Sequence, residues 1–246
     1  MRASNHGELG LIVLSSCKEL GGLVDERILQ LRAEEDDDKS YLVPIEEVRF
    51  SNGEGKIKLL DSVRGKDIYI LCDVGNYSCE YTMFGRSHCM GPDEHFQDIK
   101  RVLSAIGGKA DRVTVIMPLL YASRQHKRKG RESLDCAMAL KELENLGVHA
   151  ILTFDVHDPT IHNAIPGTSF ENIFPTYSML KCFIANEGAN IKKDNMTVIS
   201  PDTGAMDRAI YYANTLGVDV GMFYKRRDHT VVVNGKNPIV QHEYIG

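Results

Sequence analysis

The feature that most constrains the fold of this chain is a repeating order of short apolar runs and helix-like segments. The runs rich in branched aliphatic residues predict strands at residues 11–15, 57–60, 67–72, 112–117 and 150–154. The segments with helical spacing predict helices at residues 18–32, 92–106 and 132–146. Strands separated by helices of this length are typical of parallel βαβ units, so the predicted fold class is α/β.

The same order begins again after Pro175. Here the predicted strands are 196–200 and 220–224, and the predicted helices are 176–186 and 204–216. We therefore predict two parallel-sheet βαβ domains, residues 1–172 and residues 173–246. The intervening stretches 73–91 and 159–175 are predicted to be loops, because turn-forming residues interrupt their apolar pattern.

Composition narrows the class of protein. A chain of 246 residues with 43 % hydrophobic residues can fill a proper core. The net charge of −5 gives no electrostatic case for binding nucleic acid. Six cysteines without a C-x-x-C pair indicate reduced thiols, and no apolar run approaches the length of a membrane span. We expect a cytoplasmic protein that binds neither nucleic acid nor membrane.

Ligands of open parallel sheets bind beyond the carboxyl ends of the strands, and four such strand exits carry unusual residues. The first, residues 118–132, places five basic side chains within eight positions: Arg124, Lys127, Arg128, Lys129 and Arg131. Guanidinium and ammonium groups in this number can hold a polyphosphate. A solvated basic loop is the alternative interpretation.

The second and third exits carry carboxylates. Asp155-Val-His157-Asp158 can ligate a hard cation, although a histidine in this position is often structural. Asp202 follows Pro201 in a tight turn that precedes a helix N-terminus, where free N–H groups favour anions. Asp202 could bind a metal there, or it could only cap the helix.

The fourth exit holds three consecutive cations, residues 225–227, which repel one another unless an anion or solvent compensates them. Together the four exits predict a crevice with cationic clamps, a divalent cation and a helix terminus. Groups of these kinds are what phosphoryl or pyrophosphoryl transfer requires, because that chemistry depends on positioning and charge stabilisation. The common nucleotide-binding classes are disfavoured, since the chain has no G-x-x-x-x-G-K-[ST] loop.

Six segments, in the same order along the chain, resemble the ribose-phosphate pyrophosphokinase family. They are RFSNGE at 49–54, SVRGKD at 62–67, YASRQ at 121–125, DVH at 155–157, SPDTGA at 200–205 and KRR at 225–227. The chain departs from the family pattern at three positions and by one residue inserted before Arg124. Asn52 stands where many members have aspartate, and His126 and Lys129 stand where aspartates often follow the R-Q pair.

The resemblance implies domains of the phosphoribosyltransferase-like type and transfer of pyrophosphate from ATP to ribose 5-phosphate, giving 5-phosphoribosyl 1-pyrophosphate and AMP. It implies that Phe50, Asn52 and Glu54 contact the adenine, and that Arg124 and Gln125 hold the nucleotide. It implies that His157 and Asp202 contact Mg²⁺. It implies that Lys225 and Arg227 contact the transition state. It also implies a homo-oligomer, with dimers assembled into hexamers.

Family members continue with an acidic strand and a T-G-G-T-like turn that holds the ribose 5-phosphate, whereas this sequence stops at Gly246. We therefore expect an incomplete second domain, weak binding of ATP at most, and negligible turnover by this chain alone. The alternative function is that of a non-catalytic regulatory homologue, which binds nucleotide and assembles with active subunits.

Overall fold

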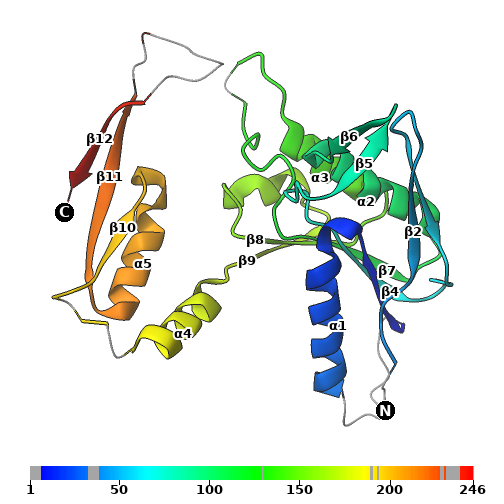
Figure 1. The fold of residues 1–246 in the computed structure, drawn as a ribbon, viewed down its shortest axis with the longest axis horizontal. Helices are drawn as coiled ribbons and strands as arrows, with labels where there is room; N and C mark the ends of the chain where they lie inside the picture. The colour runs from blue at the N-terminus through cyan, green and yellow to red at the C-terminus, as the bar shows by residue number, and fades with distance from the viewer. Residues whose placement is uncertain are drawn as a thin grey trace. The chain divides into compact units, whose positions relative to one another are not determined.

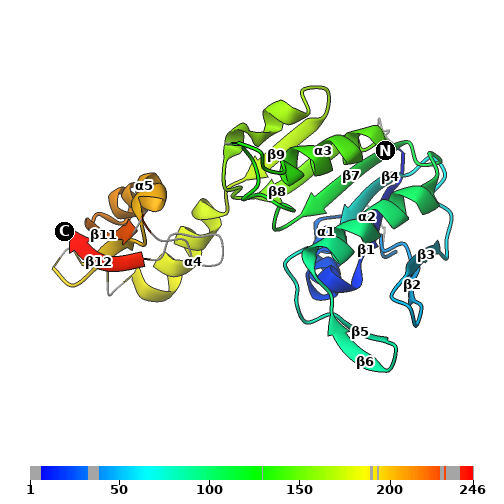
Figure 2. The ribbon, with the colours of Figure 1, turned by 90° about the horizontal axis from the view of Figure 1, so that it is seen from above.

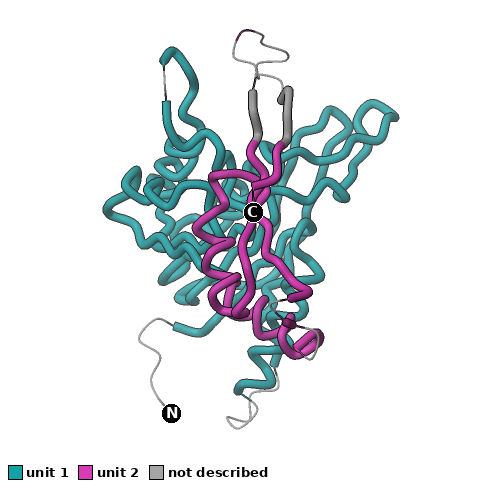
Figure 3. Tube along the Cα trace, turned by 90° about the vertical axis from the view of Figure 1, so that its left-hand side faces the viewer, with its two compact units in different colours: residues 1–174 teal, residues 175–246 magenta. Residues whose placement is uncertain are grey.

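The computed structural model describes residues 7–32, 39–128, 130–188, 191–192, 194–227, 230 and 239–245, with backbone alone at 225–227 and 239–242. The chain divides into two compact units, Met1–Phe174 and Pro175–Gly246, which Figure 3 draws in teal and magenta.

The first unit is built on a five-stranded parallel sheet in the spatial order β1-β4-β7-β8-β9 (Figure 1). Its strands are β1 (Leu9–Val13), β4 (Asp67–Leu71), β7 (Arg112–Met117), β8 (Ala150–Phe154) and β9 (Ser169–Ile173). Every neighbouring pair in the sheet is parallel, so the predicted α/β class is confirmed. All five strands therefore end at the same edge of the sheet.

Helices α2 (Pro92–Ile106) and α3 (Asp135–Asn145) cover one face of this sheet, above the strands in Figure 1. Ile99 and Val102 of α2 join Ile70 and Val115 of the sheet in the main hydrophobic core. Proline at the first position of α2 is compatible with the helix start, because its missing N–H would have no helical partner. Gly107 ends the helix in the left-handed conformation, which glycine adopts without a steric penalty.

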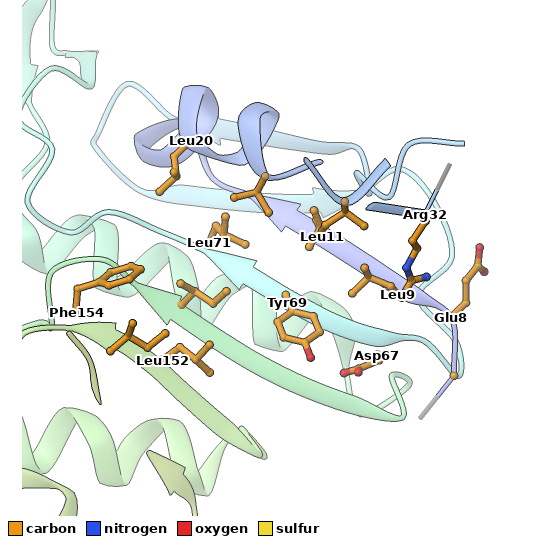
Figure 4. Close-up of a pocket in the computed structure, with 15 residues that line it drawn as sticks. Glu8, Leu9, Leu11, Leu20, Arg32, Asp67, Tyr69, Leu71, Leu152 and Phe154 are labelled. Carbon is orange, nitrogen blue, oxygen red and sulfur yellow. The ribbon is translucent and has the colours of Figure 1, made fainter. Parts of the chain in front are cut away.

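The opposite face carries helix α1 (Lys18–Arg32), which packs over β1 and β4. Beside α1, the strands leave an open groove of about 630 Å³, shown in Figure 4. Its walls are mainly aliphatic and aromatic, with Leu20 on the helix side and Leu71, Leu152 and Phe154 on the strand side. Parallel strands are usually buried on both faces, so this sheet is covered unequally.

Two antiparallel hairpins lie outside the central sheet: β2 (Ile45–Arg49) with β3 (Gly55–Leu59), and β5 (Glu80–Met83) with β6 (Arg86–Cys89). The predicted loop over 73–91 therefore contains an unpredicted hairpin at 80–89. Phe84 and Gly85, at φ 47° and 78°, form the two-residue turn between β5 and β6. Such a turn usually carries asparagine and glycine, and phenylalanine in the first position conceals the signal.

Other predicted boundaries also differ. Strand β2 was not predicted, because two glutamates interrupt its apolar residues, and β3 begins two residues before the predicted strand. Within the predicted loop 159–175 the chain forms a short 3-10 helix, η3 (Pro159–Ala164), and the edge strand β9. Strand β9 escaped prediction because Ser169 and Glu171 make it polar.

The second unit has helix α4 (Thr176–Glu187), strand β10 (Thr197–Ser200), a 3-10 turn η5 (Thr203–Ala205), helix α5 (Met206–Leu216), and strands β11 (Asp219–Arg227) and β12 (Ile239–Ile245). Strands β10 and β11 are parallel and joined through α5, whereas β12 pairs antiparallel with β11. Ala209 and Ala213 are the buried residues of α5. Across the described parts of both units, no helix combines the length and apolar character needed to cross a membrane.

Because the two faces of the sheet are covered unequally, two adjacent substitutions in β8 should lower the free energy of unfolding by different amounts. Ile151 is 0 % exposed and packs in the main core, whereas Leu152 points into the open groove. Ile151→Ala should lower the free energy of unfolding by about 2–5 kcal/mol, and Leu152→Ala should cost clearly less. Chemical denaturation of both variants measures this difference; equal costs would mean that the groove is filled in solution.

Thiol labelling gives a second test of the fold. Burial raises the pKa of Cys17 to about 11, with the charge of Asp73 adding to it, and burial raises the pKa of Cys136 to about 12. Since the thiolate is the nucleophile, both should resist alkylation at neutral pH. Cys89 and Cys182 are exposed and should react first. Mass spectrometry after brief alkylation would contradict the fold if Cys17 or Cys136 were modified as fast as Cys89.

Candidate functional site

The exits of β7 and β8 lie next to each other because these strands are parallel and in register, with Met117 opposite Thr153. Each exit contains one non-glycine residue in the left-handed region, Ala122 at φ 52° and Asp155 at φ 51°. Such backbone costs on the order of 1–3 kcal/mol and tends to concentrate at active sites and ligand-binding loops. The conformations of both exit loops are therefore specified tightly by the surrounding structure.

The turn after β7 carries the predicted nucleotide-binding residues Arg124 and Gln125, and both side chains are exposed. The Gln125 N–H donates to the carbonyl oxygen of Ala122 at 2.7 Å, which closes the turn. Lys127 and Arg128 follow and are also exposed, whereas Lys129 lies outside the described residues. The first exit thus presents a series of cationic side chains to solvent at the edge of the sheet.

The loop after β8 is held by hydrogen bonds to its own surroundings. The Val156 N–H donates to Oδ1 of Asn172 at 3.1 Å, and the Asp155 N–H donates to the Ile173 carbonyl at 3.1 Å. Asp158 caps η3 by accepting from the Thr160 N–H at 3.0 Å and from its hydroxyl at 2.6 Å. His157 lies between these anchored positions with its side chain exposed.

His126 joins the two exits. Its Nε2 lies 3.2 Å from Oδ2 of Asp158, and its ring meets the ring of His157 edge-on, with the centroids 5.1 Å apart. In the sequence, His126 stood out only as a departure from the family pattern. Its contact with the second exit could not be deduced, because it depends on the register of β7 and β8.

The charge of Asp158 is favoured by this environment. Hydrogen bonds from the Thr160 hydroxyl and N–H lower the pKa of Asp158 despite some opposing desolvation, and His126 and Lys127 contribute through their charges. Asp158 is therefore ionised at neutral pH. The second exit presents a carboxylate that accepts two hydrogen bonds from Thr160 and lies 3.2 Å from Nε2 of His126, beside the exposed imidazole of His157.

The predicted adenine contacts lie together in the turn between β2 and β3. Phe50 is 47 % exposed at the end of β2, and Oδ1 of Asn52 accepts from the Glu54 N–H at 3.1 Å. The turn is braced by the neighbouring hairpin, where the Phe84 N–H donates to the Ser51 carbonyl at 2.9 Å. Figure 2 shows these two hairpins side by side.

The remaining predicted residues belong to the second unit. Asp202 accepts from the Gly204 N–H at 3.1 Å and caps η5, as the capping alternative expected. Lys225 and Arg227 lie in β11, where Lys225 is opposite His242, but their side chains lie outside the described residues. The roles of all nine predicted site residues stay predictions.

The side chains at the β8 exit suit a magnesium ion that binds together with a nucleotide. Within the described parts of the chain, no group of three histidine, cysteine or carboxylate side chains is arranged to hold a metal. Mg²⁺ typically keeps several waters and binds one or two protein groups together with substrate phosphates. An exposed His157 beside the ionised Asp158 fits that limited role, with the imidazole reaching the ion directly or through water.

Comparison with known proteins adds independent evidence. Curated ribose-phosphate pyrophosphokinases are similar to this chain: that of Ralstonia nicotianae is 27 % identical over 212 residues, which is 80 % of this chain and 60 % of the relative. That of Streptomyces coelicolor is 26 % identical over 207 residues, covering 83 % and 57 %. The chain therefore spans only about three fifths of the length of these relatives.

The fold has a counterpart among solved structures. The crystal structure of phosphoribosylpyrophosphate synthetase from Mycobacterium smegmatis matches with a TM-score of 0.71 and 20 % identity, over 97 % of this chain and 67 % of that one. At this identity the match supports the α/β fold alone. Residues 9–147 match the family described as the N-terminal domain of ribose phosphate pyrophosphokinase. Because this match covers more than half of the chain, the protein belongs to the ribose phosphate pyrophosphokinase family.

Proposed function

We propose that this protein acts as a ribose-phosphate diphosphokinase, transferring the β,γ-pyrophosphoryl group of ATP to the 1-hydroxyl of ribose 5-phosphate. The observation that carries the proposal is the junction of two strand exits, one bearing exposed cations and the other His157 beside an ionised Asp158. Membership of the family supports the same reaction. The products would be 5-phosphoribosyl 1-pyrophosphate and AMP.

The reaction makes specific demands on the protein. The sugar hydroxyl attacks the β-phosphorus, the bond from that phosphorus to the α-phosphate oxygen breaks, and AMP leaves. Little covalent chemistry is needed from the side chains, so positioning and charge neutralisation dominate. Mg²⁺, when bound with ATP, would supply part of that neutralisation.

Each predicted residue takes a role on this basis. Phe50, Asn52 and Glu54 would contact the adenine, and Arg124 with Gln125 would hold the nucleotide. His157 and Asp202 would serve the magnesium. Lys225 and Arg227 would neutralise the charge that develops on the transferred group. These roles follow the family resemblance, and the exposure of Arg124, Gln125 and His157 leaves them accessible to a nucleotide.

The proposal extends to the whole protein. The two domains would be residues 1–172 and 173–246, of the phosphoribosyltransferase-like type. The assembly would be a homo-oligomer based on dimers. These statements rest on relatives that are longer than this chain, which covers 51–60 % of several of them.

Binding of ATP at the exit of β7 has a direct test. In an NMR titration with millimolar Mg·ATP, the amide signals of residues 122–126 and 155–158 should shift. Arg124→Gln should weaken binding at least about tenfold, since a charged hydrogen bond to phosphate contributes roughly 1.5–3 kcal/mol. Arg27→Gln, at an exposed arginine of α1, is the matched control and should change nothing. Equal affinities for the two variants would remove Arg124 from the site.

Catalysis by Lys225 is tested on the longest chain that the open reading frame encodes. Lys225→Ala should lower kcat by on the order of 10²–10³, because a partner of the transition-state charge is lost. Lys181→Ala, at an exposed lysine of α4, should leave kcat unchanged. An unchanged kcat in Lys225→Ala would exclude Lys225 from the mechanism. If the chain has no activity of its own but stimulates or inhibits a longer paralogue, the regulatory alternative is favoured.

A further inference from the structure

Among residues 124–128 of the β7 exit loop, one side chain is withdrawn from solvent. Arg124, Gln125, Lys127 and Arg128 are all exposed, whereas the side chain of His126 is only 10 % exposed. A polar side chain that is buried between exposed neighbours needs partners that satisfy it. The partners of His126 therefore indicate what this residue does for the loop.

His126 has one partner on each side. Its Nδ1 lies 3.1 Å from the Ser123 carbonyl oxygen within its own loop, and its Nε2 lies 3.2 Å from Oδ2 of Asp158 in the loop after β8. Both partners are hydrogen-bond acceptors. A neutral ring carries a single N–H and can donate to either of them, whereas an imidazolium can donate to both. The imidazole thus ties the two strand exits together.

The same ring meets His157. The two rings are inclined by 63°, and their centroids are 5.1 Å apart, an edge-on contact that restricts how the exposed His157 ring can turn. Asp158, the chain neighbour of His157, is held at the same time by Thr160 and by His126. His126 therefore contacts His157 directly through the two rings, and it also contacts the side chain of the next residue, Asp158.

We propose that His126 is a positioning residue, which fixes the orientation of the His157 imidazole and the distance between the β7 and β8 exits for a magnesium nucleotide. This proposal rests on the proposed function, since it assigns a role within the same site. It requires no direct contact between His126 and the ligand. Outer groups of this kind typically change metal affinity about 10- to 100-fold when they are removed.

The chain supplies a matched control in His162. Its Nδ1 lies 2.6 Å from the Pro159 carbonyl, so it makes the same contact with the residue three positions earlier that His126 makes with Ser123. His162 is exposed, whereas His126 also reaches the neighbouring loop. His126→Asn and His162→Asn each remove an imidazole ring. Only His126→Asn also removes the contact that joins the β7 and β8 exits.

The first measurement needs no nucleotide. Ring ¹H–¹⁵N NMR signals of His157 should move in His126→Asn, because the shorter side chain cannot reach Asp158. They should stay near their original positions in His126→Gln, whose amide nitrogen can take the place of Nε2, and in His162→Asn. His157 signals that are unchanged in His126→Asn would overturn the proposal.

The second measurement is a titration with Mg·ATP. His126→Asn should weaken binding about 10- to 100-fold, with most of the affinity restored in His126→Gln and none lost in His162→Asn. In a His157→Ala background the same His126→Asn change should lower the Mg·ATP affinity much less, because the effects of coupled substitutions are not additive. A loss of equal size in both backgrounds would show that His126 acts independently of His157, and would overturn the proposal.

The two measurements separate the two hypotheses. If the unsubstituted chain binds no Mg·ATP even at millimolar concentration, the proposed function fails, and with it the nucleotide role of His126, whatever the NMR signals show. If it binds Mg·ATP equally well with and without His126, the function stands and the positioning role fails. Thermal midpoints of all variants identify any loss of affinity that comes from unfolding.

Discussion

The candidate site depends on the parallel pairing of β7 with β8. Because Thr114–Met117 lies in register with Ala150–Thr153, the chain leaves both strands at the same edge of the sheet, and loops separated by about thirty residues meet there. Helix α3, which lies between them in the sequence, packs on the same face of the sheet as α2 and contributes to the main core. A slip in this register would separate His126 from Asp158, because their contact spans only 3.2 Å.

The sheet also divides the molecule into faces with different properties. One face is closed by α2 and α3, whose aliphatic residues fill the main core, and this face provides the rigid support of the exits. The other face is covered by α1 over β1 and β4 and opens into the groove beside it. The exit loops belong to the edge between these faces, where loops on rigid strands can carry exposed functional groups.

Much of this arrangement could be predicted from the sequence, because strands such as β4 and β7 are rich in branched aliphatic residues and helices such as α2 carry both a start and a stop signal. The hairpin β5–β6 could not, since its turn places Phe84 where asparagine would mark it. Edge strand β9 was missed because only two of its five residues, Phe170 and Ile173, are apolar, and they form neither an apolar run nor a strict alternation. The exits themselves were predictable, but the link through His126 is a tertiary contact that no local pattern records.

A crystal structure of this chain with Mg·ATP would test the site at the β7 and β8 exits most directly. We expect phosphates between residues 124–126 and residues 155–158, with the ion next to His157 and the His126–Asp158 contact retained. Nucleotide bound elsewhere in the first unit, for example in the groove beside α1, would contradict this expectation. So would a nucleotide at the predicted edge with the ring of His126 turned away from Asp158, since the two exits would then be joined by something else.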